Sequence, residues 1–358
     1  MKTINVNAKG GKYDVLIGRG LLADCGKYIK DVSKAVKLAV ITDDNVDSFH
    51  GEKVVKALES EGFEVCKFVF PHGEQSKTPE TLIKIWNFLC ENNITRSDCL
   101  VALGGGVTGD MTGFAAASYL RGMDFVQFPT TLLAQVDSSV GGKTGVDLPG
   151  GKNLVGAFKQ PKLVLCDIDA LDTLPEEFFI DGMGEVVKYG MIKSAKFFEL
   201  LEKYDLKSLR ADKEVLEDVI SQSVSIKRDV VQIDECDRGE RMKLNFGHML
   251  GHSIEQYYNY TGITHGQAVA AGMRMITQVA ENHGITEAGT LERLKNCLDL
   301  YRLNVPIEPT MGQLGAACLN DKKRFGDDIN IVVCCDIGAS MIKKMHVQAF
   351  LAMLTEQD

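Results

Sequence analysis

The stretch Cys99-Leu100-Val101-Ala102-Leu103-Gly104-Gly105-Gly106-Val107-Thr108-Gly109-Asp110 indicates how the first half of the chain folds. It begins with five apolar residues, as in a strand buried on both faces, and its three glycines lead into a helical pattern over residues 105–119. The alternation of apolar strand and helix recurs, with strands at 37–42, 64–70, 125–128 and 163–167 and helices at about 50–60 and 79–90. It predicts a largely parallel sheet flanked by helices.

The rest of the chain has a different texture. Alternating apolar and polar residues predict a hairpin over 2–17. Farther along, 3.6-residue periods with few β-branched runs predict helices at 182–203, 212–233, 246–260, 266–284 and 288–300. One strand is expected there, at 329–335, before a closing helix from about His346. We therefore predict an α/β N-terminal domain, 1–174, with a mostly parallel Rossmann-like sheet, and a mostly α-helical C-terminal domain, 175–358, with a cleft between them.

Composition restricts the partners and the location. The 358 residues are 45% hydrophobic and 25% charged, as in an ordinary globular protein, and the formal charge of −9 argues against a nucleic-acid or anionic-membrane surface. The first residues lack the apolar core of a signal peptide, and no apolar run reaches the roughly 20 residues that span a bilayer. Ten cysteines occur without a Cys-x-x-Cys pair, which is typical of reduced core thiols. We expect a cytoplasmic protein with small-molecule partners.

The glycines at 104–106 are also a candidate anion site. Consecutive glycines between a strand and a helix let backbone N–H groups approach a phosphate at the positive end of the helix. The spacing matches neither the dinucleotide Gly-x-Gly-x-x-Gly nor the P-loop, so a tight turn without a ligand stays an alternative. Two features favour a nucleotide. Asp43 or Asp44, with Asn45, ends an earlier strand, where an acid can bind ribose hydroxyls, and Glu74 and Lys77 follow another.

The stretch Arg241-Met242-Lys243-Leu244-Asn245-Phe246-Gly247-His248-Met249-Leu250-Gly251-His252 concentrates chemistry in the second half. If it is helical from Gly247, His248 and His252 lie at i and i+4 on one face. With His265, which opens the next apolar run, they form a trio that suits a divalent metal. The alternative is that each histidine caps or fills a helix pair, but the chain has only seven histidines and three fall within eighteen residues.

Other charged segments allow two interpretations each. Residues 137–145 and 150–153 resemble a glycine-rich polar loop, whose lysines either bind phosphate or serve solubility. Glu185 and Lys188, at i and i+3, are ordinarily explained as a surface ion pair. Lys227-Arg228 and residues 321–324 are ordinarily solvated helix faces.

Several motifs in the same order resemble the 3-dehydroquinate synthase family of sugar-phosphate cyclases. The matching blocks are Thr42-Asp43-Asp44-Asn45-Val46, Pro71-His72-Gly73-Glu74-Gln75-Ser76-Lys77, residues 104–110, 128–137, 184–190 and 245–252, and Asp321-Lys322-Lys323. They span nearly the whole chain, so together they are far more specific than any one motif. The resemblance implies an NAD-dependent, zinc-dependent lyase that acts on 3-deoxy-D-arabino-heptulosonate 7-phosphate, as a homodimer.

Position by position, the resemblance also implies roles for individual residues. Zn²⁺, with Co²⁺ as an alternative, would be bound by Glu185, His248 and His265, which makes His252 a neighbour of the metal or of the phosphate rather than a ligand. The substrate-binding positions match Asp137, Lys143, Asn153, Lys188, Lys227, Arg241, Asn245, His252 and Lys322 or Lys323, with Arg121 contributed by a partner subunit. NAD would lie against Gly104, Gly105, Gly106 and Asp110, near Asp43, Asn45, Glu74, Lys77, Thr130, Thr131, Lys143, Lys152 and Thr173.

The implied chemistry is oxidation by NAD⁺, phosphate elimination, reduction by the same NADH, ring opening and an intramolecular aldol closure. Three rival interpretations are a sister cyclase for another sugar phosphate, a metal-dependent polyol dehydrogenase, and an inactive nucleotide-binding regulator. The first would be expected to lack cations for a substrate carboxylate, which are present here as Lys227 and Arg241. The second would release NADH, and the third would not need an intact metal set.

Overall fold

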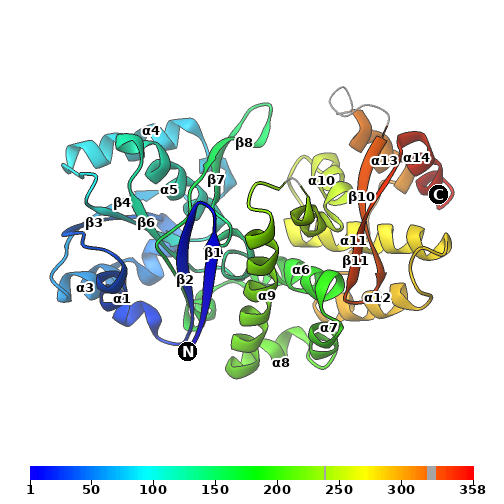
Figure 1. The fold of residues 1–358 in the computed structure, drawn as a ribbon, viewed down its shortest axis with the longest axis horizontal. Helices are drawn as coiled ribbons and strands as arrows, with labels where there is room; N and C mark the ends of the chain where they lie inside the picture. Colours follow the sequence, from blue (N-terminus) through cyan, green and yellow to red (C-terminus); the bar gives the residue numbers. More distant parts are fainter. Residues whose placement is uncertain (238, 321–327) are drawn as a thin grey trace. The chain divides into compact units, whose positions relative to one another are not determined.

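The computed structural model describes residues 1–237, 239–320 and 328–358, and Figure 1 shows the chain. It divides into two compact units: the first is Met1–Pro175 with Lys227–Glu235, and the second is Glu176–Ile226 with Cys236–Asp358. The boundary at 174/175 predicted from the sequence assigns Lys227–Glu235 to the second domain. In the structure this segment, which contains the end of a long helix, belongs to the first unit. The predicted residues Lys322 and Lys323 lie outside the described residues.

The first unit is built on one mostly parallel sheet. Its strands are β1 Lys2–Ala8, β2 Gly11–Gly18, β3 Lys37–Asp43, β4 Glu64–Phe70, β5 Cys99–Gly104, β6 Asp124–Pro129 and β9 Leu163–Asp167, in the order β1-β2-β9-β6-β5-β3-β4. Its helices are α1 Cys25–Val32, α2 Asp44–Val46, α3 Glu52–Ser60, α4 Pro79–Glu91 and α5 Gly106–Ser118, with short turns η1 Leu21–Asp24, η2 Asp47–Gly51, η3 Glu74–Ser76, η4 Tyr119–Arg121, η5 Ala134–Ser138 and η6 Ile168–Thr173. Only β1 pairs antiparallel to its neighbour, so the predicted parallel, Rossmann-like sheet is confirmed.

Both faces of this sheet are covered because its strands are apolar at consecutive positions. Leu38 and Val40 of β3 belong to the core cluster that α1 and α3 cover, while Ala39 and Ile41 belong to the one that α4 and α5 cover. Chain order reverses between β3 and β5, which are neighbours in the sheet. Ligands of open α/β sheets bind at the carboxyl ends of the strands at such a reversal, which is where Asp43 and Gly104 lie.

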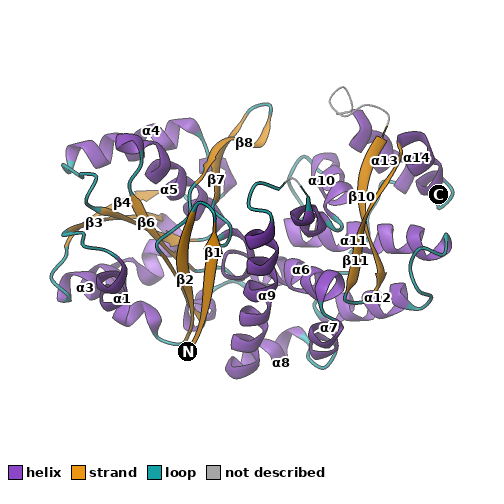
Figure 2. Ribbon diagram, in the orientation of Figure 1, coloured by secondary structure: helices purple, strands orange, loops and turns teal. Residues whose placement is uncertain are grey.

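The segment 137–153, predicted as a polar loop, is a different structure. It enters a two-stranded antiparallel hairpin, β7 Lys143–Leu148 and β8 Gly151–Phe158, visible as orange strands in Figure 2. The strands were not predicted from the sequence because residues such as Gly145 and Gly156 have weak strand propensity. They are required nonetheless, since a Cβ on Gly156 would lie 2.0 Å from the carbonyl oxygen of Thr144 on the paired strand.

The second unit is mostly helical. Its elements are α6 Glu176–Lys193, α7 Ala195–Leu201, α8 Leu206–Ala211, the first part of α9 Lys213–Ile233, η7 Glu240–Asn245, α10 His248–Tyr257, α11 His265–Asn282, α12 Thr290–Leu300, α13 Met311–Asn320, β10 Asp328–Asp336, β11 Ala339–His346 and α14 Val347–Thr355. The predicted helices are present, although the pattern at 182–203 is two helices with Ser194 capping the second.

A second strand beside β10 was not predicted from the sequence. The hairpin of β10 and β11 is tied to the end of α6, where Gly338 N–H donates to Met191 O at 2.9 Å and the Ser340 hydroxyl donates to Ile192 O at 3.0 Å. Most β11 side chains are exposed or half-buried, so the strand has little of the apolar signal that marks β10. No helix in the described ranges is long and apolar enough to cross a membrane.

Candidate active site

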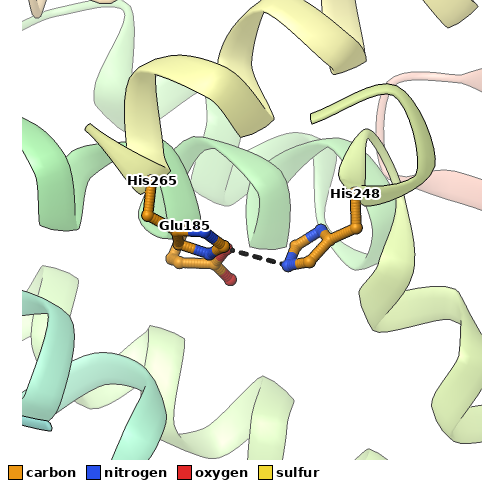
Figure 3. A group of neighbouring side chains, drawn as sticks. All are labelled: Glu185, His248 and His265. Carbon is orange, nitrogen blue, oxygen red and sulfur yellow. Dashed lines mark ion pairs between the residues drawn. The ribbon is translucent and has the colours of Figure 1, made fainter. Parts of the chain in front are cut away.

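Three helices of the second unit bring a carboxylate and two imidazoles together (Figure 3). Glu185 comes from α6, His248 is the first residue of α10, and His265 is the first residue of α11. Their ligand atoms all lie within 4.8 Å of one another. The Nε2 atoms of His248 and His265 are 3.4 and 3.6 Å from Oε1 of Glu185, so all three side chains face one point.

Glycines let these helices approach closely enough. A Cβ on Gly184 would lie 2.6 Å from the Cα of Gly266, so the helix carrying Glu185 and the helix carrying His265 touch through their backbones. A Cβ on Gly272 would lie 2.0 Å from the carbonyl oxygen of Gly247, which closes α10 onto α11 in the same way. The glycine beside each ligand residue therefore sets the spacing of the site.

The beginnings of α10 and α11 fix both histidines in the first turn. Gly247, with φ 79°, is the N-cap of α10, and only glycine adopts that left-handed conformation without strain. Thr264 and Gln267 form a capping box, in which each side chain bonds the backbone N–H of the other residue, so α11 begins at His265. The helix starts are thus encoded locally, and each places an imidazole.

Burial and neighbouring charges shift the pKa values of the titratable groups in this site. Glu185 and Lys188 form an ion pair whose side chains are only 1% and 2% exposed, so the prediction of a surface pair is wrong. Burial raises the pKa of Glu185, but Lys188 and the two imidazoles outweigh it and hold that pKa well below its usual value. Burial and the charge of Lys188 lower the pKa of His248 to about 3. Burial also disfavours a charged His265, yet Glu185 and Glu255 raise its pKa to about 10.

The donor set fits a divalent transition-metal ion. Oε1 of Glu185 is buried and has no hydrogen-bond partner among the described residues, and it points at the same place as two imidazole nitrogens. Nδ1 of His248 lies 3.2 Å from the Phe246 carbonyl, and Nδ1 of His265 lies 3.3 Å from Oε1 of Glu255. These contacts direct each Nδ1–H to an oxygen and each Nε2 to the centre, as in metal sites. One carboxylate and two imidazoles suit Zn²⁺ or Co²⁺.

Further predicted residues line the space beside this centre. Asn245, His248 and His252 border a cavity of about 300 Å³ whose remaining wall is largely apolar, with Ile331 and Phe350 among its residues. The ring centroid of His252 lies 5.5 Å from that of His248, although His252 is not in the ligand cluster. The i, i+4 spacing therefore brings the rings together without making them equivalent. Arg241, on η7, is buried in the same unit and is 3% exposed.

The glycine loop of the first unit forms a cradle at the carboxyl end of β5. A Cβ on Gly104 would lie 2.4 Å from Oγ1 of Thr108, so a side chain there would force Thr108 to move. The space at Gly105 is also tight, since a Cβ there would lie 3.1 Å from Thr131. Asp43 caps the next helix by accepting from Val46 N–H at 2.9 Å, and it also accepts from the Thr108 hydroxyl at 3.3 Å. Thr130, after β6, has a buried hydroxyl with no hydrogen-bond partner among the described residues.

A second polar group in the first unit surrounds Lys77. Its ammonium donates to Oδ2 of Asp110 and to Oδ1 of Asn153, each at 2.6 Å, and lies 4.0 Å from Glu74. Burial disfavours the charge, but Asp110 and Glu74 raise the pKa of Lys77 above its ordinary value. Lys152 lies 3.9 Å from the same Glu74 oxygen. The structure thus joins Asn153, expected to bind substrate, to residues expected near NAD.

Lys227, which is buried, and Asp137, which is half-buried, form an ion pair that sequence reasoning did not connect. The Lys227 ammonium donates to Oδ1 of Asp137 at 2.7 Å and to its carbonyl oxygen at 2.6 Å, across ninety positions of sequence. Thr173 is similarly joined to a residue outside the predicted set, since its hydroxyl lies 2.9 Å from Nε2 of His50. Other residues missed were Glu255 and Thr108. Glu255 had a weak signal, because it lies three positions after His252 on the same helix.

The structure also places the remaining predicted residues on their elements. Asn45 lies in α2, Lys143 opens β7, and Thr131 accepts from Ala134 N–H at 3.1 Å. Arg121 ends η4 with φ 64°, next to Leu120 with φ 50°. Lys188 forms an ion pair with Glu185 of the metal-binding cluster.

The fold and these sites define a class: a doubly covered parallel sheet with a glycine cradle at its strand ends, joined to a helical unit with a three-residue metal-binding cluster. Family models described as the N-terminal and C-terminal parts of 3-dehydroquinate synthase match residues 67–181 and 182–324. Relatives named 3-dehydroquinate synthase from Clostridium botulinum and Clostridium perfringens are 46% and 48% identical, over 98% of this chain and 100% of theirs. The chain belongs to the 3-dehydroquinate synthase family.

Solved structures support the same fold. The 2-epi-5-epi-valiolone synthase of Streptomyces hygroscopicus, described with NAD⁺ and Zn²⁺ bound, superposes with a TM-score of 0.86 and 26% identity, over 98% of this chain and 99% of that one. A 2-deoxy-scyllo-inosose synthase superposes with a TM-score of 0.88 at 23% identity, over 99% of each chain.

The metal cluster generates the first prediction. His248→Ala removes one of three ligands, so zinc affinity should fall by more than ~100-fold, because losing a group that merely orients a ligand already costs about 10–100-fold. Metal content after dialysis and calorimetric titration with Zn²⁺ measure this. The control is His283→Ala, at the other end of α11, whose imidazole contacts Val279 O and Glu356 instead. Full zinc content in His248→Ala would exclude the assignment.

Proposed function

We propose that this protein is a 3-dehydroquinate synthase, which converts 3-deoxy-D-arabino-heptulosonate 7-phosphate into 3-dehydroquinate and phosphate in the shikimate pathway. The observation that carries the proposal is the cluster of Glu185, His248 and His265 in a chain of this family. Oε1 of Glu185 is buried without a hydrogen bond among the described residues, and one imidazole nitrogen of each histidine lies 3.4 or 3.6 Å from it. The reaction combines transient oxidation, phosphate elimination, reduction and an intramolecular aldol closure. We propose 1–174 as the cofactor-binding domain and 175–358 as the metal- and substrate-binding domain.

Glu185, His248 and His265 would hold Zn²⁺, or Co²⁺ in its place. Such an ion would act as a Lewis acid toward a substrate hydroxyl and the carbonyl derived from it. Lys188 neutralises the Glu185 carboxylate before an ion binds, through a contact that also keeps that carboxylate in place. Glu255 and the Phe246 carbonyl orient the two imidazoles. The chain's own groups therefore supply a preformed donor set.

Gly104, Gly105, Gly106 and the start of α5 would hold the pyrophosphate of NAD, because backbone N–H groups at a helix start bind anions. NAD⁺ would accept a hydride from the substrate and return it later in the same turnover. Other groups proposed for the cofactor are Asp43, Asn45, Glu74, Lys77, Asp110, Thr130, Thr131, Lys143, Lys152 and Thr173. The unpartnered hydroxyl of Thr130 supports this proposal, since a buried hydroxyl usually has a partner.

The substrate has a carboxylate, hydroxyls and a phosphate, and the proposed residues divide accordingly. Lys143, Asn153 and His252 would hold the phosphate, with Arg121 of a second subunit. Lys227 and Arg241, with a lysine of 322–323, would hold the carboxylate, and Asp137, Lys188 and Asn245 the hydroxyls. Lys227 and Asp137 already hold each other, so a carboxylate would share the ammonium with an existing partner.

The second prediction concerns the cofactor cycle. If NAD⁺ is reduced and reoxidised within one turnover, dehydroquinate and phosphate should accumulate in large excess over the NAD⁺ supplied, without growth of NADH absorbance. The assay combines purified protein, the heptulosonate phosphate, NAD⁺ and Zn²⁺, and follows both products. NADH released in proportion to product would instead support a polyol dehydrogenase, and no turnover with intact zinc binding would support an inactive regulator.

The third prediction separates this activity from that of sister cyclases. Arg241 is buried and can grip a carboxylate with paired hydrogen bonds worth about 2–4 kcal/mol. Arg241→Ala should therefore lower kcat/KM for the heptulosonate phosphate by about 100-fold or more, since ~1.4 kcal/mol is tenfold. Lys243→Ala is the control, because that cation of the same turn pairs with Glu240.

The unmodified protein should also react poorly with a heptulose phosphate that lacks the carboxylate. Both substrates are compared on both proteins by following phosphate release. A better reaction with the neutral sugar phosphate, or an unchanged kcat/KM in Arg241→Ala, would assign the protein to a sister activity.

We further propose that the protein works as a homodimer in the cytoplasm, with Arg121 completing the site of its partner. Arg121 and Leu120 both adopt left-handed φ angles, each at a cost of order 1 kcal/mol, and Arg121 is exposed. We infer that this turn presents the Arg121 side chain to the partner subunit. Sedimentation should give a dimer, and mixing Arg121→Ala with His248→Ala should restore activity in hybrid dimers. Absence of recovery in verified hybrids would show that Arg121 acts within its own subunit or not at all.

A further inference from the structure

The β7–β8 hairpin is irregular at Lys152 and Asn153, two proposed site residues. Val146 pairs with Val155 and Leu148 with Gly151, so residues 152–154 of β8 stand opposite the single residue Asp147 of β7. Asn153, within this bulge, has a left-handed φ of 55°. A bulge redirects side chains, and a non-glycine residue in that conformation needs support from its surroundings.

Asp147 supplies that support with two hydrogen bonds. Its Oδ1 accepts from the backbone N–H of Asn153 at 2.7 Å, which closes the bulge. Its own backbone N–H donates to the carbonyl oxygen of Lys77 at 2.8 Å. One residue therefore connects the bulge of the hairpin to the residue that carries the buried ammonium.

Lys77 in turn determines which way the Asn153 amide points. An ammonium has donors and no acceptor, so the atom 2.6 Å from Nζ of Lys77 must be the amide oxygen. The second donor contact, to Asp110 at 2.6 Å, holds the 5% exposed ammonium in place. The amide nitrogen of Asn153 then faces away from Lys77 as a donor, on an exposed residue, where it suits an anion.

We infer that Asp147 is a positioning residue, which holds the 152–154 bulge so that Asn153 presents its amide nitrogen to the phosphate of the substrate. The inference rests on the proposed function for the identity of that phosphate. It assigns to Asp147 no contact with substrate or cofactor. For holding the bulge, the acceptor oxygen of Asp147 matters more than its negative charge, because the group that donates to Oδ1 is a backbone N–H.

The experiment compares Asp147→Ala with Asp147→Asn. The asparagine keeps an acceptor oxygen at the same distance and should stay within about threefold of the unmodified protein. The alanine should raise both KM for the heptulosonate phosphate and the inhibition constant of inorganic phosphate by about tenfold or more, the usual effect of losing a hydrogen bond to a charged acceptor. Equal loss in both variants, or a loss of kcat with KM unchanged, would overturn the inference.

A double-mutant cycle tests whether Asp147 acts through Asn153. Asn153→Gly keeps the backbone N–H and accepts φ 55° without strain, so it removes only the amide. Asp147→Ala should then add little to the effect of Asn153→Gly, and additive effects would contradict the inference. If Asp147→Ala does not fold, Asp147→Ser replaces it, because its hydroxyl is one atom too short to reach. Titration with inorganic phosphate keeps the test valid even if the unmodified protein shows no turnover, which is the separate failure of the proposed function.

Discussion

The buried carboxylate of Glu185 is the constraint on which the second unit depends. A carboxylate that is 1% exposed loses its hydration, at a cost of several kcal/mol, and is tolerated only beside compensating charge. Lys188 supplies it on the same helix, and His248 and His265 supply polar partners from two others. Because removing one partner of a buried pair costs about 3–5 kcal/mol, the charge and the packing of α6, α10 and α11 support each other.

The three helices can bring these side chains together only because their backbones are in contact where the helices cross. Any side chain at Gly184 or Gly272 would separate the helices and move the ligand atoms apart. The first unit uses the same device at its strand ends, where Gly104 leaves room only for the Thr108 side chain. In both units, glycine is found where two segments of the chain must approach closely to form a site, and the polar side chains of the site lie close to these glycines in the sequence.

The sequence predicted what local pattern can encode. Strand and helix alternation identified the sheet, and the concentration of His248, His252 and His265 in a short segment predicted a metal site. The structure brings His248 and His265 together with Glu185, which the resemblance had named, and leaves His252 outside the cluster. Prediction from the sequence failed where burial determines the role of a residue. Glu185 and Lys188 at i and i+3 read as a surface pair, because the sequence does not show which helix face is covered. The β7–β8 hairpin was missed because its glycines have weak strand propensity, and its bulge because the contacts with Lys77 come from seventy positions earlier.

Fold and function separate in this family. The superposed structures are cyclases with other names at 23% and 26% identity, whereas the relatives that share nearly half of their residues are named 3-dehydroquinate synthase. A common backbone therefore occurs in proteins with different names, and a choice among substrates on such a backbone must lie in side chains that the backbone leaves variable. Buried cations such as Arg241 are candidates for that choice, because a guanidinium can bind a carboxylate with two parallel hydrogen bonds. If Arg241 binds the acid as proposed, the same residue would disfavour a neutral analogue, because that analogue cannot accept the two hydrogen bonds.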